Sequence, residues 1–281
     1  MKSKFNIVIL ILIVLISIVS LAYKFSQPQE TISTPKPSQV VSIPAAPHFE
    51  YSGAEGPDKW ALLADQYKEC ASKVQTPIDI KSQEAIKSSL PPITFNYIQQ
   101  KYKVTDNGHT IVYTPTQDSN ITVNGKKSKL LQFHYHIPSE HEIDNKQYKM
   151  EVHFVNKSED GNLTVVGVFI TPGQANTEFD KLVNSMIKLP VHDDSNHINP
   201  ANKTELLSDV IDINKLLPSN TKLYNYTGSL TTPPCTAGVN WLLFETPISV
   251  SALQISPFSD KYDNNSRPIQ PTNGRIIYSN N

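Results

Sequence analysis

Hydrophobic and polar positions alternate with a period of two in the stretch 131–136. Successive side chains of a β-strand point to opposite faces, so residues two apart share a face. Gln132, His134 and His136 therefore project to one side of a predicted strand. An isolated His-x-His pair is more often a surface or structural feature than a metal site, so this stretch does not establish ligation by itself.

The stretch 150–154 has the same alternation and contains a third histidine. Glu151 and His153 share one face of this second predicted strand, and the opposite face is apolar, made by Met150, Val152 and Phe154. Two neighbouring antiparallel strands would gather three imidazoles in one patch. Three neutral nitrogen ligands with an open fourth position are what a catalytic zinc requires.

The remaining pattern predicts a mainly β protein. Many short segments rich in Val, Ile, Tyr and Thr are separated by Pro, Asn and Gly, which is typical of strands joined by turns. The run 5–22 differs, because it is continuously apolar and follows Lys2 and Lys4. It fits either a cleaved signal peptide or an uncleaved membrane anchor, and both place the rest of the chain outside the cytoplasm, in the periplasm or the extracellular space.

Composition divides the chain into three parts. Residues 1–25 contain the signal or anchor, and residues 26–47 form a linker rich in Pro, Ser and Thr that cannot bury apolar area. Residues 48–281 are long enough for one domain. The net charge is −1 and the only basic run is Lys126-Lys127, so nucleic acid is not an expected partner.

The chain contains two cysteines, Cys70 and Cys235. Two cysteines in an exported protein usually form one disulfide, and two buried free thiols are the alternative. A bridge would constrain the segment that contains Thr231, four residues before Cys235.

Several further motifs resemble those of the α-class carbonic anhydrases, and they occur in the order of that family. They extend from about residue 49 to 277 and comprise Tyr51 with Gly56-Pro57 and Trp60, Gln75-Thr-Pro-Ile-Asp-Ile80, Phe133-His-Tyr-His-Ile-Pro-Ser-Glu-His141, Glu151-Val-His153, Gly228-Ser-Leu-Thr-Thr-Pro-Pro-Cys235 and Arg267-Pro-Ile-Gln-Pro271. The short link from His136 to His141 is more similar to bacterial members than to animal ones.

The resemblance implies a large central, mostly antiparallel β-sheet surrounded by short helices. It implies Zn²⁺ held by His134, His136 and His153, and reversible hydration of carbon dioxide to bicarbonate and a proton. Gln132 and Glu151 would fix the tautomers of His134 and His153, and a backbone carbonyl near Asn265 would serve His136.

The resemblance also implies the remaining parts of the site. Thr231 would orient the nucleophile and donate a hydrogen bond to Glu140, and His109 would carry the product proton to solvent. The water chain would be ordered by Tyr51 and Asn107. The carbon dioxide pocket would be lined by Val155, Val165, Leu230, Thr232, Val239 and Trp241.

Two other functions compete with this interpretation: a non-catalytic binding or adhesion module on the same fold, and a zinc esterase. Members that lose catalysis lose zinc ligands, whereas this chain retains all three histidines. His141 is expected to form structural hydrogen bonds, and His48, His192 and His197 are expected at the surface. The sequence leaves the oligomeric state undetermined.

Overall fold

The computed structural model describes residues 47–189 and 203–280. The expected signal or anchor, most of the linker, and the surface positions His192 and His197 lie outside these residues. Within the described ranges, no helix has the length and apolar character needed to cross a membrane.

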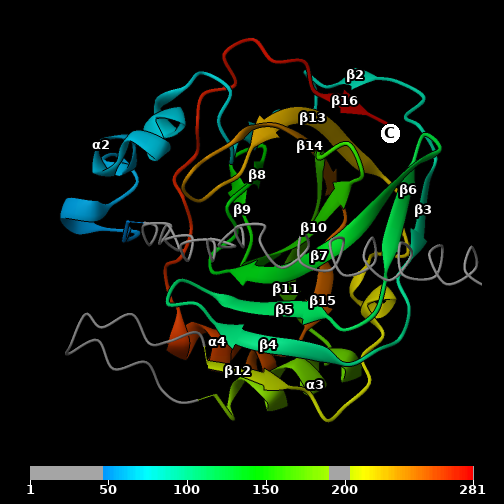
Figure 1. Cartoon of the computed structure of the whole chain (residues 1–281). Coiled ribbons are helices and arrows are strands. Elements are labelled where there is room, and N and C mark those ends of the chain that lie inside the picture. Colours follow the sequence, from blue (N-terminus) through cyan, green and yellow to red (C-terminus); the bar gives the residue numbers. More distant parts are fainter. Residues whose placement is uncertain (1–46, 190–202, 281) are drawn as a thin grey trace, which may run out of the picture. The chain divides into compact units, whose positions relative to one another are not determined.

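A 13-stranded mixed sheet forms the centre of the molecule (Figure 1). Most neighbouring strands are antiparallel, while β11–β14, β11–β15 and β16–β2 are parallel. The main path runs through β12 (Lys203–Leu206), β4 (Tyr102–Asp106), β5 (Ile111–Pro115), β7 (Lys126–His136), β10 (Met150–Ser158), β11 (Leu163–Pro172), β14 (Ala237–Phe244), β13 (Leu223–Ser229), β16 (Tyr278–Ser279) and β2 (Ile86–Lys87). This arrangement confirms the predicted fold class.

Shorter strands complete the sheet and form a second one. β15 (Ile248–Val250) pairs with β11, while β6 (Asn120–Val123) lies between β3 (Ile93–Asn96) and β7. The turn from β6 to β7 is Asn124-Gly125, and both residues have positive φ, as a two-residue hairpin requires. The separate three-stranded sheet contains β1 (Asp79–Ile80), β8 (Glu142–Ile143) and β9 (Lys146–Gln147).

The two faces of the central strands contact different cores. Met150, Val152 and Phe154 of β10 join a large apolar cluster that also contains Phe179 and Phe258. These two phenylalanines lie on α3 (Thr177–Met186) and α4 (Ala252–Lys261). On the opposite face, Val155 joins a second cluster around Trp241. The alternation of β10 thus places Glu151 and His153 on the face of the second cluster.

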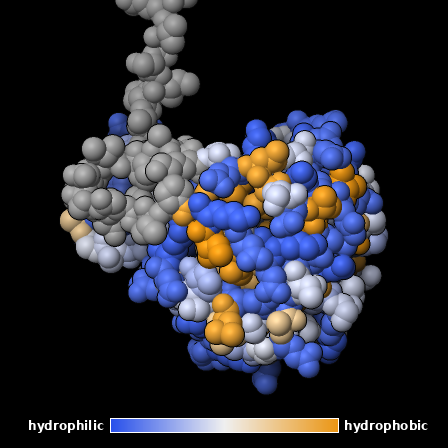
Figure 2. All heavy atoms as spheres, turned by 90° about the horizontal axis from the view of Figure 1, so that it is seen from below, coloured by the Kyte–Doolittle hydropathy of each residue, from blue (hydrophilic) through white to orange (hydrophobic). Residues whose placement is uncertain are grey.

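Helices α3 and α4 are both capped by side chains. Asn176 accepts hydrogen bonds from Glu178 N and Phe179 N, and Ser251 forms a capping box with Gln254. A single helical turn, η4 (Ile213–Leu216), buries two more apolar residues beside them. Figure 2 shows the face seen from below in Figure 1, where these helices lie, and its hydrophobic residues form separate patches among hydrophilic ones.

The N-terminal part of the described chain contains η1 (Gly53–Glu55), α2 (Trp60–Leu63) and η2 (Asp65–Ala71). Trp60 is buried against Phe49 and next to the disulfide between Cys70 and Cys235. The disulfide confirms the predicted pairing and joins positions 165 residues apart in the sequence.

Candidate metal centre

The three histidines meet because β7 and β10 are antiparallel neighbours. His153 lies directly opposite His134, and Glu151 lies opposite His136. One ring nitrogen of each histidine lies within 4.8 Å of the others, so the group could hold a metal ion. The predicted patch of imidazoles is therefore formed by strand alternation and register.

The second ring nitrogen of each histidine forms a hydrogen bond with an oxygen. His134 Nδ1 lies 2.8 Å from Gln132 Oε1, and His153 Nε2 lies 2.8 Å from Glu151 Oε1. His136 Nδ1 lies 2.7 Å from the backbone oxygen of Asn265. Because these oxygens accept, each nitrogen must carry the proton, and the lone pairs remain on Nε2 of His134, Nε2 of His136 and Nδ1 of His153.

The donor set fits a zinc ion. His136 Nε2 is buried and has no hydrogen-bond partner, which is costly unless something else binds it. Burial lowers the pKa of His134 and of His136, so both rings are neutral at neutral pH. Three neutral imidazole nitrogens around an open position are a typical catalytic zinc site.

His153 has a different electrostatic environment. Although burial lowers its pKa, the charge and hydrogen bond of Glu151 outweigh burial, and the net pKa is raised. Negative charge beside the ring therefore favours a cation at this position, and a metal ion would satisfy the same preference.

Glu151 is buried and accepts four hydrogen bonds. Oε1 accepts from His153 Nε2 and His141 Nδ1, both at 2.8 Å, while Oε2 accepts from the backbone nitrogens of Glu140 and His141, both at 2.9 Å. Burial raises the pKa of Glu151, but the charges and hydrogen bonds of His141 and His153 outweigh burial, and the net pKa lies well below its usual range. This carboxylate stays ionised and holds the segment 140–141 against His153.

Glu140 points toward the histidines from the end of that segment. Its Oε1 accepts from Arg267 N at 2.9 Å, while its Oε2 lies 3.4 Å from His136 Nε2 and 3.8 Å from His153 Nδ1. Oε2 has no hydrogen-bond partner. The hydrogen bond expected from Thr231 is thus not formed in this structure.

Thr231 is buried in the turn between β13 and β14. The turn is closed by bonds from Cys235 N to Thr232 O at 2.8 Å and from Leu230 N to Thr236 O at 3.0 Å. The disulfide attaches its end to Cys70, as the sequence predicted.

The predicted apolar wall lies beside His153. Val155, Val165, Val239 and Trp241 are buried in one cluster, and Leu230 packs against it. Strand pairing explains their proximity, because Val165 is the register partner of both Val155 and Trp241. Thr232 is partly buried in the adjoining turn.

His109 lies in the turn between β4 and β5. Asn107 Oδ1 accepts hydrogen bonds from His109 N at 3.0 Å and Thr110 N at 2.8 Å. The His109 ring packs on Phe49, with ring centroids 3.9 Å apart. The ring of His109 therefore stands against the N-terminal segment. Tyr51 lies in that segment, and its buried hydroxyl has no hydrogen-bond partner.

Arg267 and Gln75 lie in motifs shared with the carbonic anhydrases, but no role was predicted for either. Arg267 is buried and donates from Nη1 to Gln75 Oε1 at 2.7 Å, and from Nη2 to Cys70 O at 3.0 Å. Its backbone nitrogen binds Glu140. In the sequence, Arg267 appears only as an arginine in a proline-rich stretch, and this pattern does not indicate that its side chain is buried.

His141 takes the structural role that the sequence predicted. Its Nδ1 binds Glu151, and its Nε2 lies 2.6 Å from the hydroxyl of Tyr226. Since both nitrogens are engaged, the ring is not part of the set of three. His48 is exposed, as expected, and lies beside Glu50 and Glu55.

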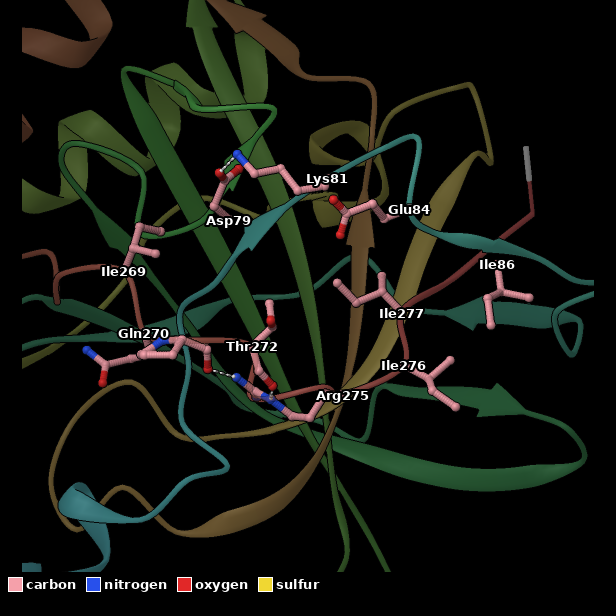
Figure 3. A pocket seen from close by; sticks show the side chains of 11 residues that line it. Asp79, Lys81, Glu84, Ile86, Ile269, Gln270, Thr272, Arg275, Ile276 and Ile277 are labelled. Atoms are coloured by element: carbon pink, nitrogen blue, oxygen red, sulfur yellow. Dashed lines mark hydrogen bonds and ion pairs between the residues drawn. The ribbon is translucent and has the colours of Figure 1, made fainter.

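An open pocket of about 530 Å³ lies elsewhere, between the segment 79–86 and the C-terminal segment 269–277 (Figure 3). Lys81 is paired with Asp79, and Arg275 donates to the backbone oxygens of Pro271 and Thr272. The pocket contains none of the predicted site residues.

Comparison with known proteins identifies relatives of this chain. Residues 55–281 match the family described as eukaryotic-type carbonic anhydrase. Carbonic anhydrases of Pectobacterium atrosepticum and Klebsiella pneumoniae are each 36% identical; the matches cover 82% and 83% of this chain and 90% and 91% of the relatives. A solved α-carbonic anhydrase from Thermovibrio ammonificans, in complex with the inhibitor sulfanilamide, is 39% identical with a TM-score of 0.76, covering 83% of this chain and 99% of that one.

Proposed function

Because this chain belongs to the eukaryotic-type, or α-type, carbonic anhydrase family, we propose that it catalyses the zinc-dependent, reversible hydration of carbon dioxide to bicarbonate and a proton. The chain is an enzyme of this family with a small-molecule substrate. The zinc ion and the role of each residue are the proposed part.

The observation that carries the proposal is the hydrogen bonding of the three histidines. Each uses one nitrogen to bind an oxygen, and the other nitrogens converge within 4.8 Å. His134, His136 and His153 would hold the zinc ion. When bound, zinc supplies a Lewis acid that makes water a nucleophile at neutral pH.

Two residues orient the nucleophile in this proposal. Glu140 presents Oε2 to the histidines without a hydrogen-bond partner, so it has an acceptor available for a hydroxyl group. Thr231 is buried in the adjoining turn and has a hydroxyl that both donates and accepts. The nucleophile would donate a hydrogen bond to Thr231 Oγ1, and the Thr231 hydroxyl would donate one to Glu140.

Carbon dioxide binds against the apolar wall. Carbon dioxide is small and has no net dipole, so a dry surface made by Val155, Val165 and Trp241 suits it better than polar groups. His109 then carries the released proton to solvent, since imidazole titrates near neutral pH. Tyr51 and Asn107 would order water between the centre and His109.

We also propose that the protein is exported. The disulfide favours an oxidising compartment, such as the periplasm or extracellular space. The apolar run 5–22 would direct export as a cleaved signal or as an anchor, with 26–47 as the linker to a domain beginning at 48. Sequencing the N-terminus of the mature protein from its host distinguishes the two, because cleavage removes the run.

Stopped-flow hydration of carbon dioxide tests the function. The purified protein should be active with one zinc per chain, lose activity with a chelator, and regain it with added zinc. His136→Ala should lose most bound zinc and activity together, because one of three protein ligands is gone. Full activity and stoichiometric zinc in that variant would show that His136 is not a ligand.

A further inference from the structure

Asn265 joins two parts of the site that are far apart in the sequence. It is buried, and its backbone oxygen accepts from His136 Nδ1 at 2.7 Å. Its backbone nitrogen donates to Ile137 O at 3.2 Å. The main chain of Asn265 therefore follows the end of β7, where His136 lies.

The side chain of Asn265 makes three more hydrogen bonds. Oδ1 accepts from Ile137 N at 2.8 Å, and Nδ2 donates to Tyr135 O at 3.1 Å. The second Nδ2 hydrogen is donated to the backbone oxygen of His109 at 3.0 Å. Both amide hydrogens are used, so the geometry of the carboxamide determines how far His109 stands from the strand end.

Other contacts shape the His109 turn but hold different atoms. Asn107 Oδ1 organises the turn internally, and Thr110 Oγ1 donates to Tyr135 O at 2.7 Å. On the outer side, Asp106 is paired with Lys261 and Tyr262 of the α4 end. The backbone oxygen of His109 accepts a hydrogen bond from Asn265 Nδ2, and Asn265 is itself bonded to the end of the strand that carries His136.

We propose that the carboxamide of Asn265 is a positioning group that fixes the distance between the metal centre and the His109 ring. The proposal rests on the proposed function, in which His109 carries the product proton. The backbone oxygen of residue 265 supports the ligand His136, while the side chain supports the proton carrier. One residue thus contacts both the metal ligand His136 and the proton carrier His109. Changing only its side chain should affect proton transfer and leave the metal ligand in place.

Asn265→Ala and Asn265→Ser test this separation, because both keep the backbone oxygen that binds His136. In zinc-loaded protein, kcat in dilute non-imidazole buffer should fall about tenfold, since a displacement of about 1 Å can cost that much in transfer rate. The value of kcat/KM should stay within about threefold, because it reports steps before proton release. Imidazole buffer should restore kcat.

Three comparisons make the experiment specific. Asn264→Ala changes the exposed neighbouring asparagine and should leave kcat unchanged. In a His109→Ala background, Asn265→Ala should lower kcat no further, because the group to be positioned is already gone. In zinc-free protein, hydrogen exchange of the segment 106–111 should be faster in the Asn265 variants than in the parent and in the Asn264 variant.

The alternative outcomes are distinct. Unchanged kcat in both Asn265 variants overturns the proposal, as does a joint fall of kcat, kcat/KM and zinc content, which indicates support of the ligand or fold alone. If His109→Ala keeps full kcat in dilute buffer, the proton-carrying role itself is wrong and the positioning role fails with it. If the parent protein hydrates no carbon dioxide, the proposed function has failed, whatever the variants do.

Discussion

Glu151→Gln is the most informative single change outside the three histidines. The carboxylate accepts two hydrogen bonds on each oxygen, from His153 and His141 on Oε1 and from two backbone nitrogens on Oε2. Glutamine has the same shape but replaces one oxygen with an amino group. Whichever way the amide is turned, two donors face that amino group and lose their acceptor.

The expected magnitude follows from these contacts. A hydrogen bond to a charged group contributes about 1.5–3 kcal/mol, so losing two of them should destabilise the protein by about 3–6 kcal/mol. The two backbone nitrogens can only donate, so the amide oxygen should face them and the amino group should face His153 and His141. His153 then loses the partner that fixes its tautomer, and loss of such a partner weakens metal binding by about 10–100-fold. Zinc affinity and stability should therefore fall together.

The pH dependence of the zinc-free protein gives a second measure. Burial alone would raise the pKa of Glu151, but His141 and His153 hold it well below its usual range. Its stabilising effect is fully present above the unfolded-state pKa of about 4.3 and is lost as the pH falls through the lowered folded-state pKa. The free energy of unfolding of the parent should therefore fall on acidification. That of Glu151→Gln should fall less, because the variant lacks the carboxylate at every pH.

Urea unfolding of zinc-free protein between about pH 3 and pH 6 and competitive zinc titration provide the assays. Glu159→Gln, at an exposed position after β10, is the matched control and should change neither quantity. Parent-like zinc affinity and stability in Glu151→Gln would refute the reasoning, because they would mean that the four contacts contribute nothing to the site.

Three further predictions address other parts of the site. Thr231→Ala should keep one zinc per chain but lose roughly tenfold or more in kcat/KM for hydration, because orientation is lost and the ligands are not; a fall that matches lost zinc would contradict it. His109→Ala should lower kcat in dilute buffer with little change in kcat/KM, and added imidazole should restore the rate; unchanged kcat would assign proton transfer to another group. Reducing the Cys70–Cys235 disulfide should lower the denaturation midpoint, corresponding to about 2–4 kcal/mol, and titration of the unreduced, denatured protein should find no free thiol; two titratable thiols would refute the pairing in the protein as made.

Short-range features of the site could be predicted from sequence because strand geometry has a fixed period. The period of two put Gln132 beside His134 and Glu151 beside His153, and the structure forms both hydrogen bonds. The same rule separated the apolar face of β10 from the face of His153. The family motifs supplied what the period cannot, namely that β7 and β10 are neighbours.

Long-range features were decided by the tertiary structure. The resemblance implied a carbonyl near Asn265 for His136, but no local pattern shows that the side chain of Asn265 also binds His109, 156 residues away. Nor does sequence show the four hydrogen bonds of Glu151 or the burial of Arg267.

The physical reason is the same in each case. Local backbone geometry determines which side chains of one strand share a face, and the sequence carries that information in its alternation. Which backbone oxygen meets which side chain across the fold depends on strand register, on turns such as the one containing Thr231, and on the packing of the last 20 or so residues against the sheet. Those contacts exist only once the whole chain is packed, and through residues 265 and 267 they join the segments of His136, Glu140 and His109.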